Sequence, residues 1–421
     1  MNRREFLMMS AAASAVAGTR FPAFGAGEEV PPPKVDHKNV KPRNRRPYSG
    51  LDWTKAHQIN GTTHMHQERN ILEVIRKRRI GFLTMTNYYP SKPVYPWREA
   101  VHERRRAVAD WPIVVNGKPR RGPFDWNKIV AEWSGEISEK DRKLLPLPAK
   151  LRPMFKPGDF PADMLEAPNA EHHHFLLANG KGAGPLHLCA PGSAFISGTP
   201  GIGNRWRLGS HGYCPGSGEF WGTAIDRMIE KLIIPDGGGV TINHPTWSRH
   251  KREFLLELLD WDPRVLGLEV LESGCNSENC WDWVLSTGRQ CYGFFVPDHG
   301  VNKEIFGISV LVVPERTQEA CLRAYRNGDF YGAAHGLGEL KFTSISFDGM
   351  TARATTDKPA KLEVVTARGV RKTVEGTSVE WTCPDAGNRQ GPEVEIFVRI
   401  RATALDGCGE TLYSQAGMLI P

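Results

Sequence analysis

The chain has 421 residues, which is enough for one large domain or two of average size. The 12 tryptophans and the 43 glycines and 31 prolines indicate a folded, loop-rich protein. Its 54 basic and 47 acidic residues give a net charge of +7, but the two signs are interspersed, so we expect no nucleic-acid partner. No apolar run reaches the roughly 18 residues of a membrane span. An integral membrane protein, a collagen-like fibre and a small disulfide scaffold are excluded.

The first residues have the pattern of an export signal. Arg3-Arg4-Glu5-Phe6-Leu7 is a twin-arginine motif, an alanine-rich stretch follows it, and Ala23-Phe24-Gly25 offers a cleavage point. We therefore expect residues 1–26 to direct export by the twin-arginine route, to the periplasm or the cell exterior. The proline-rich, charged residues 27–55 predict an extended linker.

The eight cysteines are irregularly spaced and include no CxxC pair. Disulfides are permitted in an exported chain, and Cys275 with Cys280 could close a short loop. The spacing alone fixes no pairing.

Residues 56–338 alternate apolar runs with helix-like segments, a pattern typical of an α/β barrel or a doubly wound sheet. We expect strands at residues 58–63, 80–86, 240–243, 265–271, 292–296 and 308–313, and helices at 70–79, 222–234, 254–259 and 279–287. Residues 91–165 are rich in Pro and Trp and predict an insertion over one rim. After Gly338, short strands separated by turns predict a small all-β sandwich over 339–421.

The strongest local signal for chemistry is the pair His64 and His66 at the end of an apolar strand. Residues two apart on a strand point to one side, so both imidazoles can reach a single metal ion. Such a pair is weak evidence by itself, because most His-x-His pairs are ordinary surface or hydrogen-bonded histidines.

Three further polar clusters also lie near apolar, strand-like runs. They are Glu171-His172-His173-His174, Asn243-His244-Pro245 and Pro297-Asp298-His299. Because the carboxyl ends of barrel strands converge on one mouth, four such clusters together favour a site with several Zn, Mn or Fe ions.

The ordered set resembles the polymerase-and-histidinol-phosphatase (PHP) family of metal-dependent hydrolases. The segments that carry the resemblance are Asn60-Gly61-Thr62-Thr63-His64-Met65-His66, the Glu/His cluster, Gly239-Val240-Thr241-Ile242-Asn243-His244-Pro245, Val296-Pro297-Asp298-His299, and Arg323 to Tyr331. It covers roughly residues 57–340. The family implies a distorted (β/α)7 TIM-like barrel that binds two or three divalent metal ions and acts on phosphoesters.

Carried over by position, the resemblance implies a set of metal ligands. The set is His64, His66, Glu166, His173, His174, His244, Asp298 and His299. The middle ligands stay open: Glu166 fits the family spacing better than Glu171, and the partner histidine lies within 172–174. Asp298 would also orient the nucleophile, and a nearby histidine such as His299 would protonate the leaving oxygen.

The sequence departs from the family pattern in two places. Thr86-Asn87-Tyr88 stands where the family usually has Thr-Asp-His, which removes one histidine ligand. Asp298 and His299 are adjacent, whereas the family usually separates them by one residue.

Two alternatives stay open. The first is an amidohydrolase-like enzyme that cleaves C–N or C–O bonds, although no lysine with a convincing context lies between His66 and His244. The second is a degenerate, non-catalytic protein that binds metal or glycan. For an enzyme we expect a small-molecule or glycan-linked substrate, and Arg205 and Arg207 could face an anionic one. Their glycine-rich loop lacks the Lys-Ser/Thr ending of a P-loop.

Overall fold

The computed structural model describes ten stretches of the chain: residues 32–66, 71–84, 86, 160–173, 175–195, 219–272, 274–299, 307–334, 339–384 and 395–419. It also gives the backbone of a hairpin within the expected insertion, β3 (Trp111–Val115) and β4 (Lys118–Gly122). The expected export signal, the rest of residues 91–159, the Asn87-Tyr88 pair and the arginines 205 and 207 lie outside the described residues.

One sheet begins with parallel strands near the N-terminus. β1 (His57–Thr62) pairs with β2 (Ile80–Leu83), which pairs with β5 (Leu165–Glu166), all in parallel. On the other edge of β1, β12 (Gly307–Val313) runs antiparallel, and β13 (Phe330–Ala334) follows it, also antiparallel. Strands β2, β12 and β13 are buried along their whole length, as expected for strands covered on both faces.

A second sheet has the order β6-β7-β8-β9-β11, with the short β10 (Cys275–Asn276) on β9. Its strands are β6 (Glu171–His172), β7 (Leu188–Cys189), β8 (Val240–Ile242), β9 (Val265–Glu272) and β11 (Tyr292–Phe295). The last three run parallel to one another, whereas β7 runs antiparallel to both of its neighbours.

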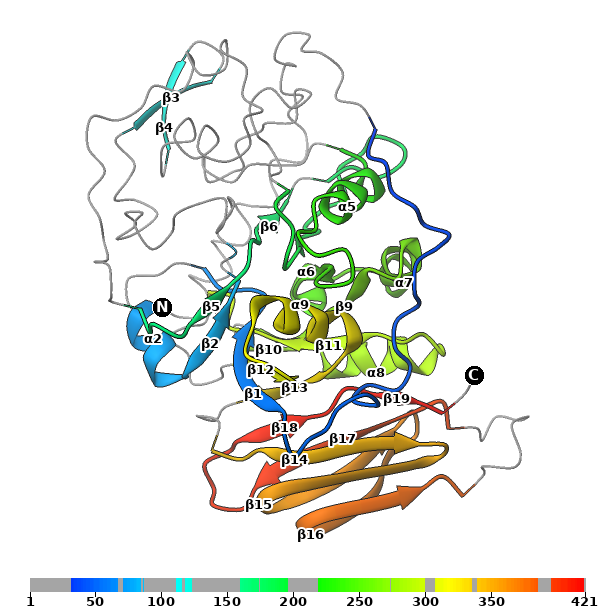
Figure 1. The fold of residues 1–421 in the computed structure, drawn as a ribbon. Coiled ribbons are helices and arrows are strands. Elements are labelled where there is room, and N and C mark those ends of the chain that lie inside the picture. The colour runs from blue at the N-terminus through cyan, green and yellow to red at the C-terminus, as the bar shows by residue number, and fades with distance from the viewer. Residues whose placement is uncertain are drawn as a thin grey trace, which may run out of the picture.

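Helices connect and cover these strands (Figure 1). They are α2 (Ile71–Lys77), α5 (Trp221–Glu230), α6 (Pro245–Ser248), α7 (Arg252–Trp261), α8 (Glu278–Ser286) and α9 (Gln318–Asn327). The bounds of α9 have a local cause: the Thr317 side chain accepts a hydrogen bond from the N–H of Ala320, and Gly328 ends the helix in the left-handed conformation. None of the described helices has the length and apolar character needed to cross a membrane.

The chain is therefore a mixed α/β protein with two sheets, and the described strands do not close into one barrel. Instead of completing a ring, β12 turns back along β1 and leads through β13 to the C-terminal strands. The two sheets still contact each other, for example where Ser309 on β12 hydrogen-bonds to the backbone of Phe295 on β11. The chain passes from β5 to β6 within a few residues, and Met65 forms a parallel bridge to Asp298.

The C-terminal part contains strands and no helix among its described residues. They are β14 (Phe342–Asp348), β15 (Thr351–Thr366), β16 (Gly369–Thr382), β17 (Phe397–Ala404), β18 (Thr411–Tyr413) and β19 (Gly417–Met418). The long β15 changes partner along its length, pairing first with β14 and then with β17, so the sheet bends around buried side chains such as Phe342 and Leu362. Because β18 pairs with β13, these strands continue the sheet of β1. A separate sandwich domain stays a prediction.

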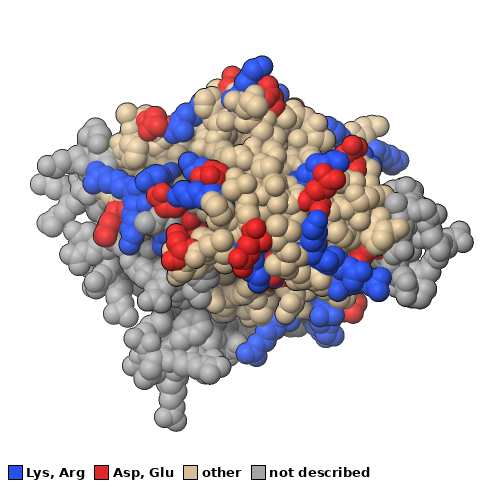
Figure 2. Space-filling view, turned by 90° about the horizontal axis from the view of Figure 1, so that it is seen from below, with Lys and Arg blue, Asp and Glu red and all other residues tan. Residues whose placement is uncertain are grey.

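The face that carries these strands mixes charges of both signs (Figure 2). Arg353 lies 2.8 Å from Glu380, and both side chains are exposed. Exposed pairs of this kind add little stability, so the alternation mainly keeps a long β surface solvated.

Residues 32–56 form no helix or strand, only bends and turns, and they are firmly attached to the α/β part. The Arg43 guanidinium donates hydrogen bonds to the carbonyls of Leu259, Val265 and Gln290. The buried Tyr48 hydroxyl donates to the carbonyl of Phe330 at 2.8 Å. This segment therefore connects β9 of the second sheet to β13 of the first.

Candidate metal centre

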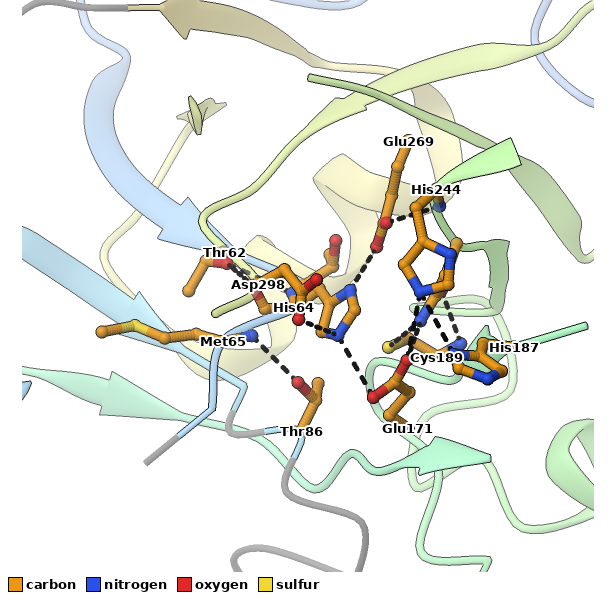
Figure 3. Close-up of polar contacts among 12 residues, drawn as sticks. Thr62, His64, Met65, Thr86, Glu171, His187, Cys189, His244, Glu269 and Asp298 are labelled. Atoms are coloured by element: carbon orange, nitrogen blue, oxygen red, sulfur yellow. Dashed lines mark hydrogen bonds and ion pairs between the residues drawn. The ribbon is translucent and has the colours of Figure 1, made fainter. Parts of the chain in front are cut away.

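The site forms where β1 and β11 end, and its first part is the histidine pair predicted from the sequence. His64 and His66 follow β1 and are buried, and the alternation of an extended chain turns both rings to the same side. Figure 3 shows the ring of His64 among Asp298, Glu171 and Glu269. Met65 between them points into the hydrophobic core and is fully buried. The Nε2 atoms of the two histidines are 3.2 Å apart.

Asp298 completes this group from the segment after β11. Its N–H donates to the His64 carbonyl at 3.1 Å, which aligns the two chain segments. Its Oδ1 is then 3.2 Å from the Nε2 of His64 and 3.2 Å from the Nε2 of His66. The structure therefore brings Asp298, from the last predicted ligand pair, into contact with His64 and His66, the first predicted pair.

Glu171, on β6, is the carboxylate at the middle of the site. Its Oε2 is 3.0 Å from the Nε2 of His66, 3.5 Å from that of His64 and 3.3 Å from that of His173. His172 lies between Glu171 and His173 and points the other way, stacked on Phe195, as strand alternation requires. Burial lowers the pKa of His172 to about 3, so this ring is neutral.

The second oxygen of Glu171 contacts a different pair of histidines. Oε1 is 2.8 Å from the Nδ1 of His187 and 3.3 Å from the Nε2 of His244, and these two nitrogens are 3.2 Å apart. Glu171 thus lies between two groups of ligand-type atoms, one on each carboxylate oxygen. We name them position one (His64, His66, Asp298 and Glu171 Oε2) and position two (His187, His244 and Glu171 Oε1).

Two of these residues have unusual backbone conformations. His244 has a φ of 30° and Asp298 a φ of 47°, both in the left-handed region that residues other than glycine rarely adopt. His244 lies two residues after the end of β8 and Asp298 three residues after the end of β11, where the chain turns away from the sheet. Such strain costs about 1–3 kcal/mol and persists at sites where the direction of a side chain matters.

The charges within the site shift the pKa values of its groups. Burial opposes ionisation of Glu171, but the neighbouring His173 and His64 outweigh it and hold the pKa of Glu171 well below its usual range. The pKa of Asp298 is likewise held low, against burial, by His64 and His299. Both carboxyl groups are therefore ionised at neutral pH, as metal ligands must be.

Two nearby groups respond mainly to burial. It raises the pKa of the Cys189 thiol well above its usual value, so Cys189 is a neutral thiol here, and its sulfur accepts a hydrogen bond from Asn243. Burial, reinforced by the charge of Asp298, raises the pKa of Glu272 to about 8.

The donor set fits divalent metal ions. A tetrahedron of ligands about 2.0–2.1 Å from a zinc ion has edges of about 3.3–3.4 Å. In position one, the Nε2 atoms of His64 and His66 lie 3.0–3.5 Å from each other and from the two carboxylate oxygens, and the separations in position two are 2.8–3.3 Å. Imidazole nitrogens with carboxylate oxygens are the ligands of Zn, Mn and Fe sites. Two sets of three residues each bring their ligand-type atoms within 4.8 Å of one another. One set is His64, His66 and Asp298, and the other is Glu171, His173 and His187.

Other predicted ligands fall in different places. Glu166 lies on β5 and joins no group of three ligand-type side chains among the described residues, whereas Glu171 is central. His299 is at the rim with about a third of its side chain exposed, and its ring stacks on His66 at 3.9 Å. Its Nε2 is 3.9 Å from Asp298 Oδ1. His174 lies outside the described residues.

Sequence reasoning missed His187 and Glu269. His187 precedes the two-residue strand β7, too short to give a pattern, and lies in a segment rich in Gly and Pro. Glu269 had a usable signal, because it is a carboxylate inside an otherwise apolar strand, Val265–Glu272, and is fully buried. A buried charge without a partner is too costly to retain, so its presence in such a strand indicates a polar site.

No protein-family model matches the chain, and no curated protein matches it either. Among solved structures, it is similar to a two-domain protein from Bacteroides vulgatus described as containing a predicted PHP-like metal-dependent phosphoesterase. The TM-score is 0.37 with 13% identity, over 87% of this chain and 95% of the other. A likeness this distant says nothing about the reaction.

Proposed function

We propose that this chain is an exported, metal-dependent hydrolase of the PHP type that cleaves phosphoesters. One observation carries the proposal: the two oxygens of Glu171 contact two separate histidine groups, the arrangement needed for a carboxylate shared by two metal ions. The order of the motifs along the chain supports the family assignment.

Position one would hold an ion through His64, His66 and Asp298, and position two through His187 and His244, with Glu171 shared between them. Divalent ions bound there would supply an acidified water and positive charge for the phosphoryl oxygens. Asp298, ionised and fixed by its backbone bonds, would orient the attacking water. His299, at the exposed rim, is placed to give a proton to the leaving oxygen.

The proposal also includes the barrel, the C-terminal sandwich and the export signal. The two sheets would be the opened halves of a distorted (β/α)7 barrel, joined where β5 leads to β6 and where Met65 pairs with Asp298. Residues 339–421 would form a sandwich that covers one end. The N-terminal signal would deliver the folded, metal-loaded chain to the periplasm or the cell exterior, where a small-molecule or glycan-linked phosphoester is its substrate.

The amidohydrolase-like alternative has less support. That chemistry generally needs a lysine that bridges the metals, whereas the group that contacts both histidine groups here is the carboxylate of Glu171. The bridging role falls to Glu171 instead.

The proposal is tested by the metal content of the purified mature protein and by hydrolysis of p-nitrophenyl phosphate and bis-p-nitrophenyl phosphate. We expect about two equivalents of Zn, Mn or Fe and measurable hydrolysis. The double variant His64→Ala/His66→Ala should lose metal and activity, whereas His57→Ala, an exposed histidine on the same strand, should lose neither. A wild-type protein with one equivalent or none would overturn the two-metal site. Full metal occupancy without hydrolysis of either ester would overturn the phosphoesterase.

A further inference from the structure

We propose that Glu269 is a positioning residue that orients one ligand of each metal position. This inference rests on the metal centre of the proposed function. Glu269 lies on β9, in the middle of the second sheet, and is fully buried. Figure 3 shows its carboxylate between His64 and His244. Its two oxygens are used separately, one for each of these residues.

The first contact sets the tautomer of His64. Glu269 Oε1 is 2.8 Å from the Nδ1 of His64. A carboxylate oxygen accepts a hydrogen bond, so Nδ1 carries a hydrogen and Nε2 is the nitrogen left to give its lone pair to a metal ion. That lone pair faces His66 and Asp298, the other groups of position one. A carboxylate on the far nitrogen of a ligand histidine also makes the ring a stronger donor.

The second contact fixes the backbone of His244. Glu269 Oε2 accepts a hydrogen bond from the N–H of His244 at 2.8 Å. His244 adopts the left-handed conformation at the start of α6, and the carboxylate stabilises its N–H in that strained turn. One side chain therefore connects a ligand after β1 to a ligand after β8.

A different residue sets the ring of His244. Ser248 Oγ donates to the carbonyl of Pro185 at 3.0 Å, so its single hydrogen is already used. Ser248 Oγ must then accept from the Nδ1 of His244, 3.0 Å away. The Nε2 of His244, which faces Glu171 and His187, is then the nitrogen left to bind a metal ion. Ser248 thus acts on position two alone. A variant at Ser248 can therefore be compared with a variant at Glu269.

Glu269→Gln has a specific expected effect. The amide has one acceptor oxygen and one NH₂ group, and the N–H of His244 can only donate, so the oxygen must turn to His244. The NH₂ group then faces the Nδ1 of His64, which can adapt by switching tautomer. The hydrogen moves to Nε2, and His64 no longer presents a lone pair to position one. Position one should therefore weaken while position two stays intact.

The experiment is a metal titration of the full chain, with Zn²⁺ in competition with a chromophoric chelator and with Co²⁺ absorption as a second readout. The wild type should bind two equivalents. In Glu269→Gln the affinity of one equivalent should fall by about 10–100-fold, the range for contacts that orient a ligand. Adding His66→Ala to this variant should leave the tighter equivalent unchanged, whereas adding His187→Ala should weaken that equivalent as well. Ser248→Ala should instead weaken the equivalent at position two and leave the equivalent at position one intact.

Glu363→Gln is the matched control, because Glu363 is a buried carboxylate bonded to Arg401 on the C-terminal strands. It should retain both equivalents. Two tight equivalents in Glu269→Gln would overturn the inference. So would loss of both equivalents together with a larger drop in the stability of the metal-stripped protein than in the control, which would make Glu269 merely structural. A wild type that binds no metal would instead overturn the proposed function itself.

Discussion

Asp298 and His66 are joined twice, once through the backbone and once through their side chains. The Asp298 carbonyl accepts a hydrogen bond from the N–H of His66 at 3.4 Å, and Oδ1 lies 3.2 Å from the Nε2 of the same residue. This double connection ties the end of β1 in one sheet to the end of β11 in the other. The metal centre is therefore also the place where the two sheets are held together, and changes at the site bear on both binding and packing.

Glu171→Gln should weaken both metal positions, because the glutamine retains a single neutral acceptor and cannot serve two ions. We expect affinity at each position to fall by at least about 100-fold, more than for an outer contact. The measurement is a chelator-competition titration. Glu166→Gln, the same change on β5, is the control and should keep both ions. If Glu166 were essential for metal binding and Glu171 dispensable, the prediction would be wrong. The ligand would then be Glu166, the residue that the family spacing favours.

His299→Asn should separate proton donation from metal binding. The ring lies at the rim beside Asp298, where it can reach a leaving group. We expect two metal equivalents to remain and kcat to fall by about 10²–10⁴-fold, with loss of the alkaline limb of the pH–rate profile. Metal analysis and a pH–rate series are the measurements. Loss of one equivalent in this variant would make His299 a ligand instead.

Tyr48→Phe tests the attachment of the N-terminal segment. The buried Tyr48 hydroxyl donates to the carbonyl of Phe330 and accepts from the N–H of Gln415, each at 2.8 Å. Removing it leaves two backbone groups unpaired, at a cost of about 1–3 kcal/mol in the free energy of unfolding. Urea denaturation gives this value, and unchanged metal content serves as the control. A change below about 0.5 kcal/mol would mean that residues 32–56 add little to the fold.

Asp329 gives a pH dependence whose sign can be worked out. Burial raises its pKa from 3.8 to about 6, so the folded chain favours the protonated form. Its contribution to stability is therefore present below pH 3.8 and is lost as the pH rises through 6. The loss should amount to about 1–3 kcal/mol.

Asp329→Asn stays neutral and keeps an oxygen for the N–H of Tyr48, which donates to Asp329 at 2.9 Å. Its stability relative to the wild type should rise between pH 4 and pH 7, as measured by urea denaturation at several pH values. Asp348→Asn, at an exposed position, should show no such trend. Parallel curves for the wild type and Asp329→Asn would contradict the prediction.

Much of the local structure followed from the sequence, because it depends on neighbours along the chain. Apolar runs predicted the strands β8, β9, β11 and β12 within a residue or two, and the periodicity of α7 and α8 was equally clear. The pairing of His64 with His66 needs only strand alternation. The nearness of Asp298 followed from its position after a strand, although its exact partner did not.

The rest was decided by contacts between distant residues. The choice of Glu171 over Glu166 depends on where β6 crosses the site, and the four residues between these two glutamates carry no signal for it. His64 and Glu269 are separated by 205 positions, yet their side chains are 2.8 Å apart. The open arrangement of the two sheets depends on the antiparallel pairing of β12 with β1, which periodicity cannot predict. Spacing along a chain defines which side chains share a face, whereas the packing of sheets determines which faces meet.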